Sequence, residues 1–254
     1  MTRDVNAVWL ELLDRLLKDG AERAPRGHPT RELLAYQTVI PMSAPVVTVA
    51  ERKLGRRFLT AEAAWILSGD NRVSSIAPYS KEIVKFSDDG LTFRGAYGPK
   101  FVDQVSYVVQ ALREDTSTRQ AVVNLWRERP GSSLDHPCTT NLQWLIRDEQ
   151  LHCVTTMRSS DVFLGWVYDT HTFSMMSAYV LLSLRQQDPP QWDRIVLGDL
   201  YLTAGSQHLY ERDRSKAAAC LNDTTLDEPF PPYPLDTLRH PEELVKELWR
   251  RANG

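Results

Sequence analysis

The sequence predicts a single α+β domain spanning residues 1–254, and three observations support this fold class. The chain is 42% hydrophobic and contains seven Trp, nine Tyr and seven Phe, which is enough to bury a large core. Segments with helical periodicity and segments with strand-like composition both occur along the chain. No internal repeat, linker or low-complexity tract divides it.

The N-terminal region predicts one helix followed by irregular structure. Apolar residues recur at helical spacing in residues 5–19, and Gly20 is a plausible end for that helix. Residues 24–33 are rich in Pro and Gly and predict a loop. The β-branched residues of 38–49 are interrupted by prolines, a pattern typical of edge or irregular strands.

The next part of the chain predicts two helices separated by loops. Residues 60–69 have the composition of a buried helix, with Thr60 as its N-cap and Gly69 at its end. Residues 70–100 predict loops, and the apolar spacing of residues 100–115 predicts the second helix.

The second half of the chain carries the predicted sheet. Residues 170–187 predict a helix, and the tail from residue 214, rich in Pro and charge, closes on a helix at 241–252. Three segments rich in Val, Leu, Ile, Thr and aromatic residues predict strands, the second with a turn inside it: 119–127, 139–159 and 193–213.

The composition excludes several functional classes. A formal net charge of −3, with scattered basic residues, provides no basic field for nucleic acid. No apolar run approaches the ~18 residues that span a membrane, and the charged N-terminus is unlike a signal peptide. Three cysteines without CxxC spacing favour neither a disulfide framework nor a zinc site. We therefore expect a reduced, soluble, cytoplasmic protein without a metal.

Charged and polar residues interrupt the apolar segment 157–173. Its hydrophobic and aromatic residues predict burial, yet Arg158, Ser159, Asp161 and Asp169 lie among them. Burying a charge costs several kcal/mol unless a partner or ligand satisfies it. The segment therefore predicts a binding site.

Cys138 is a candidate nucleophile. A lone cysteine is more often a small buried hydrophobic residue. Here Pro137 precedes it and two threonines follow, which indicates a turn that enters a strand and exposes the sulfur. The charge of Arg158 would favour the thiolate. Cys153 and Cys220 lack such surroundings and are interpreted as structural.

Several motifs together resemble the thymidylate synthase family in order and nearly in spacing. The resemblance covers roughly residues 26–213 and leaves the tail 214–254 divergent. It implies a thymidylate synthase-like fold, a twisted mixed β-sheet packed with helices. The motifs are "AEAAWILSGDN" (61–71), "GAYGPK" (95–100), "RQAVVNLW" (119–126), "PCTTNLQ" (137–143), "MRSSDVFLGWVYD" (157–169) and "AGSQHLYERD" (204–213).

The resemblance implies roles for four residues around the base. Cys138 matches the nucleophile that adds to C6 of a pyrimidine nucleotide. Glu62 matches the carboxylate that relays protons through water, although by itself it reads as a helix N-terminal glutamate. Asp161 would support the site and contact the ring or its neighbours, and Tyr97 would form a cavity wall.

The resemblance also implies a phosphate site. Arg158 and Ser159 match the phosphate-binding pair, whose guanidinium and hydroxyl donors suit a dianion. Arg26 matches a third phosphate contact, with Arg31 as a rival in a divergent loop. Arg119 matches an arginine that family members donate across a homodimer interface, and Gln120 stands where the family usually has a second arginine.

Three further residues complete the matches. His208 and Tyr210 match the pair that binds the sugar 3′-hydroxyl, and alternation along a strand puts both on one face. Gln143 matches a polar position that we interpret as structural.

Asp169 departs from the family, which has Asn at this position to pair with N3 and O4 of uracil. An ionised carboxylate facing O4 leaves two acceptors unpaired, a loss of ~1–3 kcal/mol. Cytosine offers the N4 amino donor and a basic N3 instead. With Asp at this position, the chain resembles the deoxycytidylate hydroxymethylases. Asp169 is therefore expected to bind the base and to stabilise charge on N3 during catalysis.

Two more departures favour water as the final reactant. The family tryptophan that closes over the C5 methylene has no clear counterpart, and Ile83 and Phe86 are nearest to its place. The apolar C-terminal lid is replaced by "EELVKELWRRANG". Weaker shielding opens a methylene to water.

The expected function is C5-hydroxymethylation of dCMP or CMP with 5,10-methylenetetrahydrofolate, whose binding residues would be Glu62, Ile83, Phe86, Tyr97 and Asp161. The alternative within the family is dTMP formation from dUMP. An alternative of another class is a non-catalytic nucleotide-binding or RNA-binding relative, against which the retained Cys138 speaks. The residues leave deoxyribose and ribose, and the biological pathway, undecided.

Overall fold

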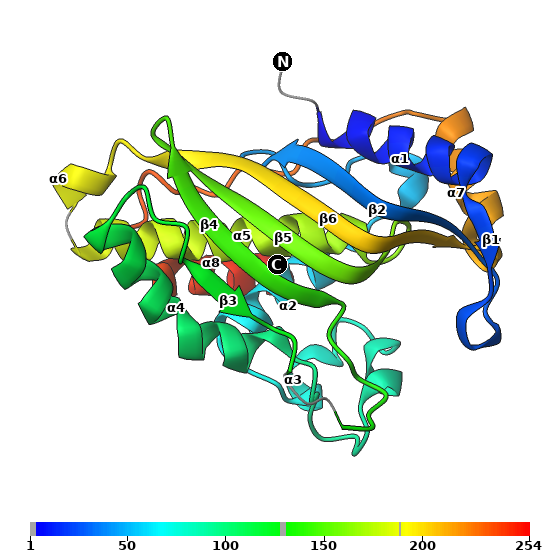
Figure 1. The fold of residues 1–254 in the computed structure, drawn as a ribbon, viewed down its shortest axis with the longest axis horizontal. Coiled ribbons are helices and arrows are strands. Elements are labelled where there is room, and N and C mark those ends of the chain that lie inside the picture. Colours follow the sequence, from blue (N-terminus) through cyan, green and yellow to red (C-terminus); the bar gives the residue numbers. More distant parts are fainter. Residues whose placement is uncertain (1–3, 128–130, 188) are drawn as a thin grey trace.

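The computed structural model describes residues 4–127, 131–187 and 189–254 (Figure 1). Their strands form one mixed sheet in the order β1-β2-β6-β5-β4-β3. Neighbouring strands are antiparallel except β5 and β6, which are parallel. The predicted α+β fold is confirmed. The strands are β1 (Ala21–Arg23), β2 (Thr30–Pro41), β3 (Val122–Asn124), β4 (Thr139–Arg147), β5 (Gln150–Asp161) and β6 (Val196–Tyr210).

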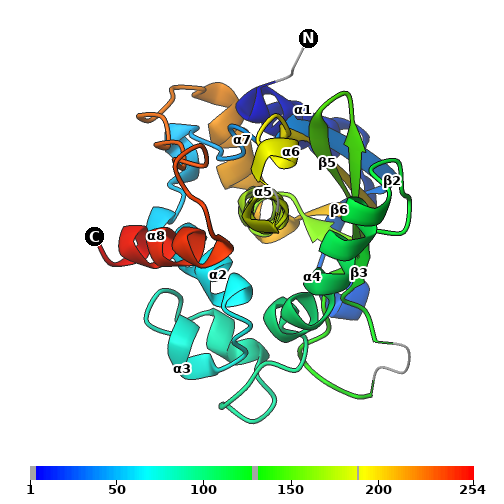
Figure 2. The ribbon, with the colours of Figure 1, turned by 90° about the vertical axis from the view of Figure 1, so that its left-hand side faces the viewer.

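Helices pack on one face of this sheet. The central one, α5, is buried around most of its circumference and lies between the sheet and the pair α2 and α8 (Figure 2). It also supplies the crossover that a parallel β5–β6 pair requires. The helices are α1 (Val5–Asp19), α2 (Arg56–Leu67), α3 (Val73–Ile76), α4 (Tyr97–Glu114), α5 (Trp166–Gln187), α6 (Pro189–Trp192), α7 (Arg214–Asn222) and α8 (Pro241–Asn253).

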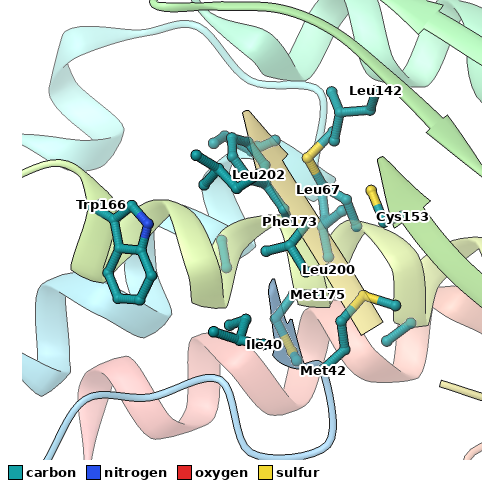
Figure 3. Packing of buried hydrophobic residues seen from close by; sticks show 14 of the residues in the cluster. Ile40, Met42, Leu67, Leu142, Cys153, Trp166, Phe173, Met175, Leu200 and Leu202 are labelled. Atoms are coloured by element: carbon teal, nitrogen blue, oxygen red, sulfur yellow. The ribbon is translucent and has the colours of Figure 1, made fainter. Parts of the chain in front are cut away.

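The core fills the space between α5 and the sheet. Figure 3 shows Phe173 and Met175 of α5 among side chains of β2, β4, β5 and β6. Two buried indole groups have a hydrogen-bond partner there, since Trp144 donates to the Ser177 hydroxyl at 2.9 Å and Trp166 to the Thr38 hydroxyl at 3.1 Å.

Among the described residues, no helix combines the length and the apolar character that a membrane span requires.

The opposite face of the sheet is open in the single chain. On β4, Leu142, Trp144 and Ile146 are buried, and the residues between them are only partly buried. Alternation along a strand puts these two sets on opposite faces. On the open face Gln37 donates to the Thr203 hydroxyl at 2.9 Å.

The boundaries of α2 differ in part from the prediction. The helix begins at Arg56 with Gly55 as N-cap, so the assignment of Thr60 as N-cap was wrong. The Thr60 hydroxyl instead donates to carbonyls one turn earlier. Tertiary contact extends the helix, because Arg57 donates to the Ala252 carbonyl of α8 at 3.0 Å. The predicted end is confirmed by Gly69, whose φ of +69° suits glycine.

Two other predictions for the N-terminal half were wrong in part. Residues 24–33 are not all loop, since β2 begins at Thr30 and pairs with β6 over its whole length. Within 38–49 only the residues up to Pro41 belong to a strand; there β2 pairs with β6 alone, as the predicted edge strand does, because β1 covers only Thr30–Glu32. The later predictions missed α7 and started α5 four residues too late.

Candidate active site

A cavity of about 170 Å³ lies between α2, the segment 83–97 and the first turns of α5. We call it the reaction cavity. Phe93 and Trp65 close its apolar side with rings 5.6 Å apart. Five of the residues predicted for catalysis or folate binding line it: Glu62, Ile83, Phe86, Tyr97 and Asp169.

Glu62 enters the cavity from the face of α2 that packs on α5. Three neighbouring alanines are fully buried and allow the two helices to approach closely. Across this contact Thr172 donates to the Glu62 carboxylate at 3.5 Å. Burial raises the pKa of Glu62 to about 7, and the Thr172 hydroxyl opposes this shift. A carboxyl with a pKa near 7 is suited to both accept and donate protons.

Asp169 lies in the first turn of α5. Asp161 creates the preceding turn, because its Oδ1 accepts hydrogen bonds from the backbone N–H groups of Phe163 (2.9 Å) and Leu164 (3.1 Å). Gly165 then leaves room for the Asp169 carboxyl, since a Cβ at Gly165 would lie 3.4 Å from its Oδ2. Burial raises the pKa of Asp161.

The carboxyl of Asp169 has an unusual environment. Burial raises its pKa well above the ordinary range, and the charges of Glu62 and Asp161 raise it further. No hydrogen bond from the described residues lowers it. These surroundings therefore favour the protonated form of the carboxyl, which has one donor and one acceptor, over the carboxylate.

Cys138 sits beside the cavity between Tyr97 and Arg158. The Tyr97 hydroxyl accepts hydrogen bonds from the backbone N–H and the hydroxyl of Thr139, at 3.2 and 3.0 Å. The backbone N–H of Arg158 donates to the Cys138 carbonyl at 2.8 Å, and its Nη2 lies 3.8 Å from the sulfur. Arg158 thus reaches the cysteine from β5.

The expected thiolate at Cys138 is not the favoured form in the free site. Burial raises the pKa of the thiol, and the charge of Arg158 lowers it by less. The carboxyls of Asp169, Asp135 and Asp161 add to the rise. Burial and the charge of Asp169 also raise the pKa of Tyr97 well above its ordinary range.

The predicted phosphate and sugar residues gather at the ends of β5 and β6. Strand pairing sets Asp161 opposite His208, and the Ser159 hydroxyl lies 3.4 Å from His208 Nδ1. The rings of His208 and Tyr210 meet edge to face at 5.0 Å, as alternation along one strand predicts. The His28 ring, 6.3 Å from that of Tyr210, brings the turn at 25–27 to this end.

Arg26 and Arg31 differ in their availability. Arg31 is largely buried and forms ion pairs with Glu22 at 3.2 Å and Glu211 at 3.1 Å. Arg26 is exposed in the turn Pro25–Gly27 with a φ of 55°. No ion pair with the described residues engages its side chain, which leaves Arg26 the freer of the two to meet an anion.

Arg119 lies away from the reaction cavity of its own chain. Its side chain is exposed just before β3, next to the exposed Gln120. Gln143 donates to the Arg119 carbonyl at 2.7 Å, a structural contact consistent with its predicted role. Within one chain, Arg119 therefore remains apart from the other predicted phosphate residues.

Sequence reasoning missed Thr172 and Asp135. Thr172 is a helix-interior threonine, for which only the structure reveals the contact with Glu62. Asp135 also lines the reaction cavity, in the turn that leads to Cys138. An acid so close to a candidate nucleophile was a usable signal.

The rim of the cavity is partly apolar. Ile83 and Phe86 belong to a single turn of 3₁₀ helix, and Phe86 is 55% exposed. The α8 helix lines no part of the cavity among the described residues; it packs on α2 and α5 and buries Leu244 and Leu248. No group of His, Cys, Asp or Glu in the described residues is arranged to hold a metal ion.

The sequence of this chain was compared with models of known protein families. The model of the family described as thymidylate synthase matches residues 7–246, which extends beyond the motifs at 26–213 into the divergent tail. Together with the mixed sheet and its covering helices, this match shows that the chain belongs to the thymidylate synthase family.

Proposed function

We propose that this protein converts dCMP or CMP into the 5-hydroxymethyl nucleotide, with 5,10-methylenetetrahydrofolate as one-carbon donor and water as the final reactant. Membership of the thymidylate synthase family implies the coarser activity, one-carbon transfer from this folate to a pyrimidine nucleotide. The choice of a cytosine base and of a hydroxymethyl product rests on particular side chains.

The observation that carries the proposal is the unpaired carboxyl of Asp169 in the wall of the reaction cavity. In its protonated form, which the raised pKa favours, the carboxyl would donate to N3 of cytosine and accept from the N4 amino group, so that every group is paired. Glu62 and Asp161 add negative charge around it. This negative charge favours a base that accepts the proton of Asp169 and becomes positively charged. N3 of cytosine is basic enough to do so when Cys138 adds to C6.

The same protonated carboxyl supports ordinary thymidylate synthesis as a second candidate. Rotated about its terminal bond, the carboxyl accepts from N3–H of uracil and donates to O4. In the free base O4 of uracil is a much weaker base than N3 of cytosine, so the hydrogen bond to it on binding is neutral and not charge-assisted. Charge-assisted hydrogen bonds are about twice as strong as neutral ones, so the acidic site favours cytosine.

Catalysis is assigned to three side chains. Cys138 attacks C6 and makes C5 nucleophilic, which is covalent catalysis. Glu62, with its pKa of about 7, transfers protons around the ring. Asp169 holds the base edge and its developing charge. The folate supplies one carbon at the oxidation level of formaldehyde, and Ile83, Phe86, Tyr97 and Asp161, with Glu62, would hold it.

The product follows from how the cavity is closed. One-carbon transfer leaves an exocyclic methylene at C5 of the nucleotide. At this rim Ile83 and the half-exposed Phe86 stand near the place of the family tryptophan. The α8 helix is fixed elsewhere, with its Asn253 accepting a 2.6 Å hydrogen bond from Tyr79. A methylene with this little cover is open to water.

Binding of the nucleotide's other end uses the ends of β5 and β6. Arg158, Ser159 and Arg26 would bind the phosphate, and His208 with Tyr210 would bind the sugar. Arg119 would complete the phosphate site from the partner of a homodimer. The open face of the sheet is the surface on which such a dimer would form.

The experiment that tests this function is mass spectrometry of the products from dCMP, CMP, dUMP and UMP, each incubated with methylenetetrahydrofolate. We expect a 5-hydroxymethyl product from a cytidine nucleotide. A methylated product from dUMP alone would instead establish thymidylate synthesis. Cys138→Ser is the control, and product formation by this variant would exclude the covalent mechanism.

A further inference from the structure

We propose that Asp135 is a further catalytic residue, the general base that delivers water to the C5 methylene of the nucleotide. This inference rests on the proposed function and assigns its last step to a side chain. Three observations carry it: where the Asp135 carboxyl lies, how it is held, and the second cavity that it adjoins.

Asp135 lines the reaction cavity together with Glu62, Tyr97 and Asp169. The backbone N–H of Gly95 donates to its Oδ2 at 2.6 Å, and its own N–H is bound by the Ser133 hydroxyl at 3.0 Å. A Cβ at Gly95 would lie 2.7 Å from Oδ1, so glycine is needed for this close approach. The carboxyl is thereby held at the cavity wall, as a catalytic group must be.

A second, smaller cavity also adjoins Asp135. It has a volume of about 20 Å³, and Arg94, Arg127, Ser133 and His136 are among the residues that line it. A polar cavity of roughly 10–15 Å³ or more holds one water molecule. Asp135 lines both cavities. It therefore borders both a water-sized space and the space where the base reacts.

The other two acids of the reaction cavity, Glu62 and Asp169, have other partners or roles. Glu62 is bound by Thr172, and Asp169 is the group that faces the base edge. Asp135 Oδ1 receives no hydrogen bond from the residues that the structure describes and is free to accept one from water. Burial and the nearby charge of Asp88 raise the pKa of Asp135, while Gly95 N–H, His136 and Lys100 lower it. A raised pKa makes the ionised carboxyl a stronger base.

The step is balanced without any oxidant or reductant. The Asp135 carboxylate takes a proton from water, and the water oxygen forms a bond to the methylene carbon. The electron pair of the exocyclic double bond moves into the ring. Cys138 then leaves C6 with the pair of the C–S bond, which restores the C5–C6 double bond. Asp135 returns its proton to solvent.

The test uses the reverse of this step and needs no folate. Purified 5-hydroxymethyl-dCMP and 5-hydroxymethyl-CMP are incubated with the enzyme in H₂¹⁸O, and ¹⁸O in the hydroxymethyl group is measured by mass spectrometry. Release of tritium from C5 of the [5-³H]nucleotides reports Cys138 addition without any hydration. Asp135→Asn keeps the side-chain shape and an acceptor for Gly95.

We expect Asp135→Asn to lose ~100-fold or more in ¹⁸O exchange, the usual contribution of a general base, while tritium release stays within about threefold of the wild type. Asp88→Asn is the matched control, because Asp88 also anchors this loop through Ser133 and Leu134 yet does not line the reaction cavity. Because the charge of Asp88 raises the pKa of Asp135 by less than burial does, this variant should exchange ¹⁸O within about threefold of the wild type.

If Asp135→Asn exchanged ¹⁸O at the wild-type rate, the inference would be overturned and the proposed function would remain intact. An equal loss of exchange and of tritium release would also overturn it, since Asp135 would then act on the Cys138 step. A wild type that forms no hydroxymethyl product from any nucleotide would overturn the proposed function, and this inference with it.

Discussion

Nη2 of Arg158 lies 3.8 Å from the sulfur of Cys138. The predicted phosphate-binding arginine therefore also acts on the predicted nucleophile. Its charge lowers the pKa of the thiol, while burial raises that pKa by more. This balance makes the reactivity of Cys138 sensitive to a single neighbouring side chain.

Replacing Arg158 should make Cys138 less reactive. Arg158→Met removes the charge but keeps a long apolar stem, so the pKa of Cys138 rises further. Alkylation by iodoacetamide near pH 8, followed at Cys138 by peptide mass spectrometry, should slow by about 3–10-fold, corresponding to roughly half to one pKa unit. Arg147→Met on β4 is the control. Equal alkylation rates in the two variants would show that Arg158 does not act on the thiol.

Glu62 should destabilise the folded protein as pH rises. Its pKa of about 7 in the folded state exceeds the model-peptide value of 4.5. Between these values the folded state binds more protons, so the free energy of unfolding falls with rising pH. Glu62→Gln should be more stable than the wild type by about 1–3 kcal/mol near pH 8, with the difference vanishing near pH 4.5. Urea unfolding across this range measures the effect, with Glu114→Gln on α4 as control. A constant difference would contradict the shift.

Gly95 should not tolerate a side chain. A Cβ there would lie 2.7 Å from the Asp135 carboxyl and 2.8 Å from its backbone oxygen, and the latter has little freedom to move. Gly95→Ala should cost about 1–3 kcal/mol of unfolding free energy. Gly131→Ala is the control, because its Cβ would meet no atom of the described residues within 4 Å. Equal stabilities of the two variants, measured by urea unfolding, would mean that the loop of Asp135 moves to make room for the added methyl group.

Active-site complementation tests whether Arg119 acts across a dimer. Arg119→Ala and Cys138→Ser should each be nearly inactive alone. Equal amounts unfolded and refolded together should regain about one quarter of wild-type activity, since half of the dimers are mixed and each has one intact site. No recovery, or a monomer by light scattering, would reject donation of Arg119 in trans.

The sequence predicted correctly those elements for which the local residue pattern and the tertiary contacts favour the same structure. The helix at 5–19 and the turn at Asp148 and Glu149 were found because periodicity and turn residues agree with the fold. The start of β2 was missed because Pro29 suggested a loop, whereas pairing with β6 fixes residues from Thr30 onward as strand. Thr60 was misplaced because a contact with α8, far away in sequence, extends α2.

The candidate site was only partly predictable. Glu62, Tyr97 and Asp169 were identified, and they meet in one cavity. The pKa shifts were not predictable, because burial outweighs the charge of Arg158 at Cys138 and raises the pKa of Asp169 well above its ordinary range. Asp135 was missed since its approach to Gly95 depends on how two distant loops pack.

The most direct test of the account is the nucleotide preference of Asp169→Asn compared with that of the wild type. Values of kcat/KM for dCMP, CMP, dUMP and UMP should show the wild type preferring a cytidine nucleotide. The amide should shift this preference toward uridine nucleotides by roughly 5–150-fold, the equivalent of ~1–3 kcal/mol for a mispaired buried group. An unchanged ratio in the variant, or a wild type that favours dUMP, would contradict the assignment of Asp169 to the cytosine edge.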